Sequence, residues 1–184
     1  KNKCEEILND PNPIPEEELV AMCVFDMNNL RTINNTLGHD KGDEYIRSFA
    51  IQLRKAVPDE FFAGRDGGDE FIAVLKGLDH TGVRECLKKI REQSAEYSRQ
   101  HPEIPISYAA GYALSSDFEG STMRELFRFA DKNMYIDKNR AKMEEAAEKQ
   151  RMNIRILEKI TEKGYQFSDC IYCDALLDQY YVLR

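Results

Sequence analysis

The chain has 184 residues, of which 42% are hydrophobic and 32% charged, so it can form the core of one domain and is not wholly disordered. Its 26 Lys and Arg residues and 33 Asp and Glu residues give a formal net charge of −7. A chain this acidic has no overall field for nucleic acid or an anionic membrane, so we expect neither as a partner. No apolar run reaches the roughly 20 residues of a membrane span. The five scattered cysteines are typical of reduced thiols, and they predict a cytoplasmic location.

The first third of the chain contains two strong patterns. Residues 10–15 are rich in proline and separate a short opening helix from the first strand. Residues 19–25 are almost entirely apolar, which at this length predicts a strand buried on both faces, and this run ends at Asp26. Residues 43–57 carry apolar side chains at helical spacing and therefore predict an amphipathic helix.

The middle of the chain predicts a hairpin followed by a helix and a strand. Two short apolar runs, residues 61–65 and 71–75, flank a turn that contains two glycines at 66–69. Helical spacing returns over residues 81–97, and the small apolar residues of 105–114 predict another strand.

A long helix is predicted to begin near Thr122, where Glu125 is spaced for a capping box, and to end at Gly164. Without the opening and closing helices, the predicted order is that of an α+β fold with a ferredoxin-like βαββαβ core. Residues 165–184 hold four of the nine tyrosines and two of the five cysteines, so we interpret them as a tail or the start of a further domain.

Three acidic residues interrupt or follow the apolar strands. Asp26 closes the first strand, and Asp69 and Glu70 lie at the tip of the hairpin. Paired strands would bring these carboxylates together at one edge of the sheet, where they repel unless a cation such as Mg²⁺ joins them. The alternative is an ordinary hairpin tip, acidic because it is exposed to water. Gly67 and Gly68 would let a phosphate approach the backbone, and we expect the turn to need positive φ.

Three segments together resemble one protein family. Residues 65–71, which read Arg-Asp-Gly-Gly-Asp-Glu-Phe, are similar to the signature of the GGDEF family, the bacterial diguanylate cyclases. Residues 25–43 resemble its stretch D-x-D-x-F-K-x-I-N-D-x-x-G-H-x-x-G-D, and residues 130–138 resemble A-D-x-A-x-Y-x-A-K. On the basis of these motifs, residues 1–142 are identified as a member of the GGDEF family. Residues 143–184 are interpreted as a helical extension and a tail.

The resemblance implies a fold like the polymerase palm and the class III nucleotide cyclases, in agreement with the predicted order of elements. It implies that two GTP are joined into cyclic di-GMP, with release of two pyrophosphates, when a 3′-hydroxyl attacks an α-phosphate with the help of Mg²⁺, or of Mn²⁺ in its place. It also implies that turnover needs a second copy of the domain. It further implies an upstream sensor domain in a longer bacterial protein, which is either anchored in a membrane or not.

The functional residues follow position by position from the same resemblance. The implied metal ligands are Asp26, the carbonyl of Met27, Asp69 and Glu70, and the last two also have the catalytic roles. The implied substrate-binding residues are the guanine-reading pair Asn34 and Asp43, together with His39, Gly67, Gly68, Lys138 and Lys142.

Some positions depart from the family pattern. Asn28 stands where the family has Asp, and Lys142 stands where Arg is commoner. The family's inhibitory Arg-x-x-Asp is replaced at Pro58 and Phe61, so we expect no product feedback through that site. The alternative to an active cyclase is a catalytically silent module that binds GTP or a protein partner. The intact acids at 26, 69 and 70 favour activity.

Overall fold

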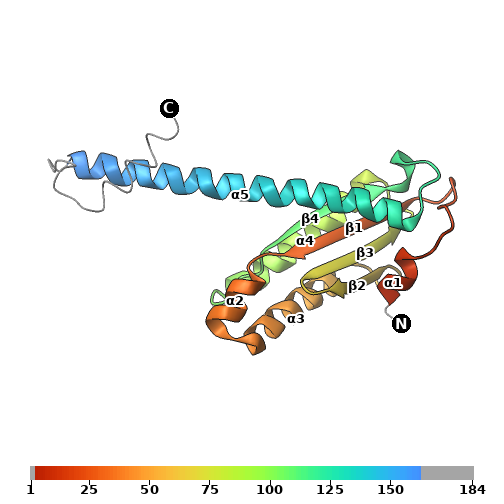
Figure 1. Cartoon of the computed structure of the whole chain (residues 1–184), viewed down its shortest axis with the longest axis horizontal. Helices are drawn as coiled ribbons and strands as arrows, with labels where there is room; N and C mark the ends of the chain where they lie inside the picture. Colours follow the sequence, from red (N-terminus) through yellow and green to blue (C-terminus); the bar gives the residue numbers. More distant parts are fainter. Residues whose placement is uncertain (1–2, 163–184) are drawn as a thin grey trace. The chain divides into compact units, whose positions relative to one another are not determined.

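The computed structural model of the chain describes residues 3–162, in which helices and strands follow each other as shown in Figure 1. The helices are α1 (Lys3–Leu8), α2 (Leu30–Leu37), α3 (His39–Ala56), α4 (His80–Gln100), the short 3₁₀ helix η1 (Ser115–Asp117) and α5 (Met123–Glu162). The strands are β1 (Val20–Met27), β2 (Phe62–Gly67), β3 (Glu70–Lys76) and β4 (Tyr108–Leu114).

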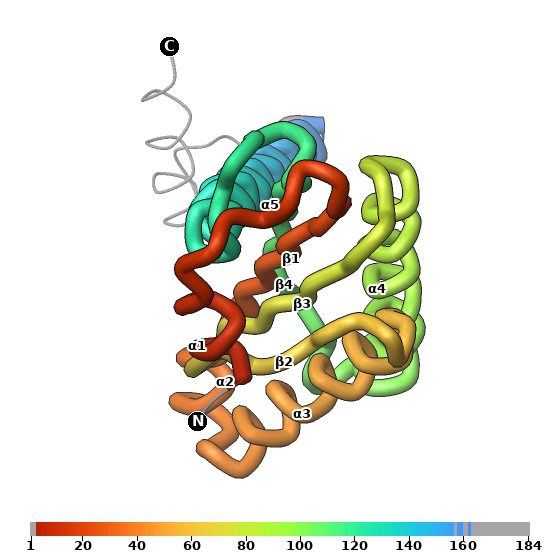
Figure 2. The backbone as a smooth tube through the Cα atoms, turned by 90° about the vertical axis from the view of Figure 1, so that its right-hand side faces the viewer, coloured from red at the N-terminus to blue at the C-terminus, as the bar shows by residue number. Residues whose placement is uncertain are grey.

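The four strands form one antiparallel sheet in the order β2-β3-β1-β4. Helices α2 and α3 lie between β1 and β2 in sequence, and α4 lies between β3 and β4. Helices α3 and α4 cover the same face of the sheet (Figure 2). This arrangement is the predicted ferredoxin-like βαββαβ core, so the fold class is confirmed.

Both faces of the sheet are buried because side chains alternate along each strand. On one face, Phe25 and Phe71 pack with Phe49 of α3 and with side chains of α4. On the other face, alternate strand residues such as Val24 pack against α1 and the first turns of α5, including Leu126. The central strand β1 is therefore buried on both sides, as its apolar run predicts.

Several boundaries differ from those predicted. The predicted helix 43–57 begins earlier, at His39, because Gly38 with φ of 91° separates it from α2. The last strand begins at Tyr108 instead of residue 105, since the backbone of Ser107 bonds to the Tyr45 hydroxyl of α3. The capping box at the start of α5 is confirmed: the Thr122 amide and hydroxyl donate to Glu125 at 2.9 and 3.0 Å. These bonds hold the pKa of Glu125 below its usual value.

The chain divides into two compact units, residues 1–138 and 139–184. Helix α5 belongs to the first unit up to Lys138, and the boundary predicted at residue 142 stays a prediction. Three of the cysteines in the described residues, Cys4, Cys23 and Cys86, are buried. The predicted helix stop at Gly164 and the predicted tail 165–184 lie outside the described residues. Over residues 3–162, no helix has the length and apolar composition needed to cross a membrane.

Candidate functional site

The site begins with two carboxylates at the end of neighbouring strands. Asp26 of β1 lies directly opposite Glu70 of β3 in the antiparallel register, so the predicted meeting of the strand-end acids is confirmed for this pair. Each acid is next in sequence to a phenylalanine, Phe25 or Phe71, whose side chain points to the face of the sheet that packs against α3. Neighbouring residues of a strand point to opposite faces, so both acids are on the other face, where α5 begins.

The hairpin turn places the third acid beside this pair. The Met27 amide donates to the Asp69 carbonyl at 3.0 Å, which ties the turn to the end of β1. Gly68 adopts a φ of 49°, whereas Gly67 does not have positive φ, so the expectation that the turn needs positive φ holds at one of the two glycines. Arg65 braces the turn, because its Nε and Nη2 donate to the Gly68 carbonyl at 2.9 and 2.6 Å.

The two glycines leave open space at the turn. A Cβ atom built on either Gly67 or Gly68 would meet no atom within 4 Å. A ligand can therefore approach this stretch of backbone, as phosphate groups do in other glycine-rich turns.

A lysine from α5 reaches the same carboxylates. Lys138 Nζ lies 2.7 Å from Asp26 Oδ1, and the two side chains are 27% and 14% exposed. The partial burial makes this a stronger charge-assisted contact than an ordinary surface ion pair. The predicted phosphate lysine and one predicted metal ligand are therefore in direct contact.

The second carboxylate has a perturbed protonation equilibrium. The pKa of Glu70 is raised above its usual value, first because the surrounding protein removes part of its hydration and then because Asp26, Asp69, Asp131 and Asp66 repel its charge. A carboxylate with a raised pKa in a cluster of acids is a typical candidate for proton transfer or cation binding.

The donor chemistry of this cluster fits a hard divalent cation. Within residues 3–162, no three His, Cys, Asp or Glu side chains are gathered into a metal site. Asp26 and Glu70 are, however, opposite each other in the strand register, and oxygen donors in small number suit Mg²⁺, which keeps positions for water and phosphate. The roles of Asp69 and the Met27 carbonyl as ligands remain predictions.

The predicted guanine-reading residues lie on α2 and α3. A Cβ atom on Gly42 would be 1.8 Å from Asn34 Oδ1, so the Asn34 side chain occupies the space that a larger residue 42 would fill. Asp43, the next residue of α3, lines the cleft described below. His39 is the first residue of α3 and is exposed.

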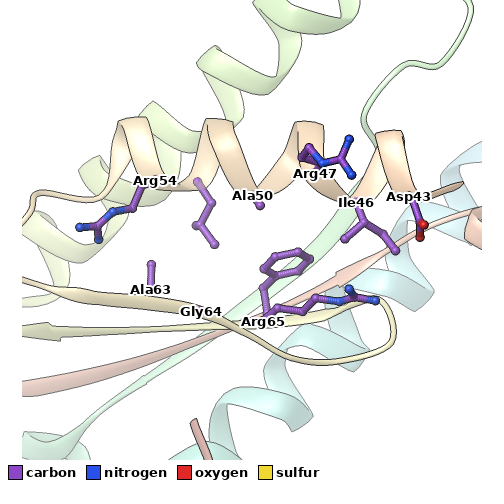
Figure 3. Close-up of a pocket in the computed structure, with 10 residues that line it drawn as sticks. Asp43, Ile46, Arg47, Ala50, Arg54, Ala63, Gly64 and Arg65 are labelled. Carbon is purple, nitrogen blue, oxygen red and sulfur yellow. The ribbon is translucent and has the colours of Figure 1, made fainter. Parts of the chain in front are cut away.

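A cleft of about 540 Å³ extends between α3 and β2 from Asp43 (Figure 3). Its apolar lining includes Ile46 and Phe71, and three arginines line it as well. They are Arg47, Arg54 and Arg65. An acidic residue beside an apolar surface with basic groups suits a heterocyclic base that carries phosphates.

Sequence reasoning missed two residues of α5 that fix this helix on the sheet. Asn133 and Asp137 stand where the family pattern A-D-x-A-x-Y-x-A-K has alanine, and each bonds to the backbone of β4. The two departures from alanine were the signal that could have found them. Lys142 belongs to the second unit, and its role in phosphate binding stays a prediction.

The comparisons with known proteins assign this βαββαβ domain, with its acid pair beside a Gly-Gly turn, to the nucleotidyl cyclase class. The chain belongs to the GGDEF domain family: the family model described as "Diguanylate cyclase, GGDEF domain" matches residues 6–144. The structure resembles the active GGEEF domain of a diguanylate cyclase from Vibrio cholerae, with 28% identity, a TM-score of 0.60, and 66% of this chain and 78% of that chain covered.

The chain is also similar to one further solved structure and to curated proteins. The GGDEF domain of DgcB from Caulobacter crescentus, in complex with c-di-GMP, is 25% identical with a TM-score of 0.59, over 66% of this chain and 73% of that chain. The signaling protein YkoW of Bacillus subtilis (strain 168) is 36% identical over 121 residues, and an uncharacterized membrane protein of Staphylococcus aureus (strain USA300) is 25% identical over 130 residues. These matches cover 64% and 69% of this chain but only 15% and 36% of the two relatives.

Proposed function

We propose that this domain is a diguanylate cyclase that condenses two GTP into cyclic di-GMP and releases two pyrophosphates. The observation that carries the proposal is the placement of Asp26 opposite Glu70, beside an open Gly-Gly turn, with Lys138 on the same carboxylate. The domain would act in the cytoplasm, where its few scattered cysteines would stay reduced.

In this proposal, Asn34 and Asp43 hydrogen-bond the guanine edge. Asp43 accepts from the paired N–H donors of guanine, which adenine does not present. Lys138 releases Asp26 and binds a phosphate of the nucleotide, so the contact seen here gives way on binding. The open turn at Gly68 lets the phosphates reach backbone amides.

The reaction consists of two condensations, and each forms a bond between the 3′-oxygen of one guanylate and the α-phosphorus of the other. Each also breaks the bond between that α-phosphorus and the leaving pyrophosphate. Glu70 accepts the proton of the 3′-hydroxyl, which is the general-base role proposed for it. A bound Mg²⁺, held by Asp26, Glu70, Asp69 and the Met27 carbonyl, would supply charge neutralisation at the phosphates. One domain carries one such set of groups, so two domains facing each other complete the reaction.

The experiment is an incubation of the chain with GTP and Mg²⁺, with chromatographic detection of cyclic di-GMP. Asp26→Asn and Asp69→Asn are expected to abolish product while the far-ultraviolet circular dichroism spectrum is retained. Asp59→Asn is the matched control, because the Asp59 side chain is 94% exposed. Normal turnover in a folded Asp69→Asn or Asp26→Asn variant would overturn the assignment of these acids. Binding of GTP without any product in the wild type would instead indicate a silent nucleotide-binding module.

A further inference from the structure

Strand β4 lies at the edge of the sheet, and its neighbour is β1. Backbone groups on the other side of an edge strand have no strand partner, which makes such an edge prone to unwanted pairing. Successive residues of a strand direct their backbone groups to alternate sides, so Ala110 and Tyr112 direct theirs to the same side.

Two side chains of α5 bond to these edge groups. Asn133 Nδ2 donates to the Tyr112 carbonyl at 2.9 Å, and the Ala110 amide donates to Asp137 Oδ2 at 3.1 Å. Four residues of an α-helix rise about 6 Å, and two residues of a strand rise about 6.6 Å, so the two spacings match. The Tyr112 carbonyl needs a donor, and a helix displaced by one turn would place Phe129 or Asp137 there, neither of which can donate, so this bond would be lost.

The backbones meet closely between these two bonds. A Cβ atom on Gly111 would lie 2.1 Å from the Met134 nitrogen and 2.4 Å from the Ala130 carbonyl oxygen, so only glycine permits this approach. The Asp137 carboxylate is 17% exposed and also lies 3.5 Å from Arg91 Nη2 of α4. Residues 110–112 of β4 therefore hold α5 at one position along the strand.

The next residue of α5 is Lys138, whose ammonium contacts Asp26. We propose that Asn133 and Asp137, here called the edge latch, are positioning residues that fix the register of α5 and thereby place Lys138 at the acid pair. The inference rests on the proposed function insofar as Lys138 is the phosphate-binding lysine. It goes beyond that function because it assigns a role in the site to two residues that touch neither substrate nor acids.

The test uses substitutions that change polarity at nearly constant size. Asn133→Asp removes the donor to Tyr112 and sets a negative charge against its carbonyl. Asp137→Asn keeps an oxygen that accepts from the Ala110 amide, whereas Asp137→Ala removes it. Lys132→Ala is the control on the same helix, since Lys132 is exposed.

The first readout needs no nucleotide. The full chain is labelled with a trace of acetic anhydride, and the acetylation rate of Lys138 relative to Lys76 is measured by mass spectrometry. We expect Asn133→Asp and Asp137→Ala to raise the acetylation rate of Lys138 about tenfold. This factor corresponds to loss of the charge-assisted hydrogen bond between Lys138 and Asp26. Asp137→Asn and Lys132→Ala are expected to stay within about twofold of the wild type.

The second readout is steady-state turnover of GTP. A misplaced phosphate lysine is expected to raise KM for GTP by about tenfold in Asn133→Asp and Asp137→Ala, with a smaller change in kcat. A role confined to stability would not produce this split, nor its rescue by Asp137→Asn. If the wild type makes no cyclic di-GMP, the proposed function is wrong. The acetylation rates still test whether the edge latch positions Lys138.

Two results would overturn the inference. One is a Lys138 labelling rate in folded Asn133→Asp within about twofold of the wild type. The other is an Asp137→Asn variant as reactive as Asp137→Ala, in which case these residues only cover the strand edge. If Asn133→Asp does not fold, Asn133→Ala removes the donor without adding charge, and it is judged by the same criterion.

Discussion

The close approach of α5 to β4 at Gly111 makes a quantitative prediction for Gly111→Ala. The added methyl group would lie 2.1 Å from the Met134 nitrogen, where ordinary contacts begin near 3.4 Å. The three nearest atoms, from Ala130, Asn133 and Met134, are all backbone atoms, so the contact cannot be relieved by rotation of a side chain. Helix α5 would therefore have to move by more than an ångström relative to β4.

The cost follows from two contributions. Overpacking of this kind typically costs about 1–3 kcal/mol. The displacement would also weaken the bonds from Asn133 and to Asp137, each worth about 1 kcal/mol. Alanine suits a strand better than glycine does, which offsets a few tenths of a kcal/mol. We expect Gly111→Ala to lower the free energy of unfolding by about 2–4 kcal/mol.

The assay is urea unfolding followed by far-ultraviolet circular dichroism, with the midpoint and slope fitted for each variant. Gly82→Ala in α4 is the matched control, because its Cβ would meet side-chain atoms of Leu78 at 3.3 Å and no backbone. We expect this control to stay within about 1 kcal/mol of the wild type. A Gly111→Ala variant with an unchanged midpoint and slope would refute the close packing of α5 on β4.

Three further predictions concern the site itself. Because the pKa of Glu70 is raised, its ionisation destabilises the fold as pH rises above the usual pKa of 4.5. Glu70→Gln should therefore slightly raise the melting temperature at pH 7, and a pH series of thermal melts should show this gain vanishing near pH 3. Asp43→Ser should shrink the preference for GTP over ATP by about ten- to a hundredfold, and an unchanged preference in a competition assay would mean that another residue reads the base. Turnover should need two copies of the domain, so specific activity should rise steeply with protein concentration; a flat value across about a hundredfold dilution of a monomeric sample would contradict this.

Much of the fold could be predicted because its signals are local. The apolar run ending at Asp26 and the Gly-Gly turn each depend on a few neighbouring residues, and the structure places β1 and the hairpin there. The pairing of Asp26 with Glu70 could also be predicted, because the register of the two paired strands fixes which residues are opposite each other at their ends. The exact starts of α3 and β4 were not predictable, because the break at Gly38 and the Tyr45 bonds to Ser107 depend on backbone geometry.

The sequence by itself therefore determined the order of the strands and of the larger helices, and the family motifs. The tertiary structure decided that Lys138 contacts Asp26 across a separation of 112 residues, and that Asn133 and Asp137 hold the helix that carries this lysine. The physical reason is that hydrophobic periodicity and turn preferences act over a few residues. A side-chain partner on a distant strand, by contrast, depends on how closely two backbones pack, and here that depends on the missing side chain of Gly111.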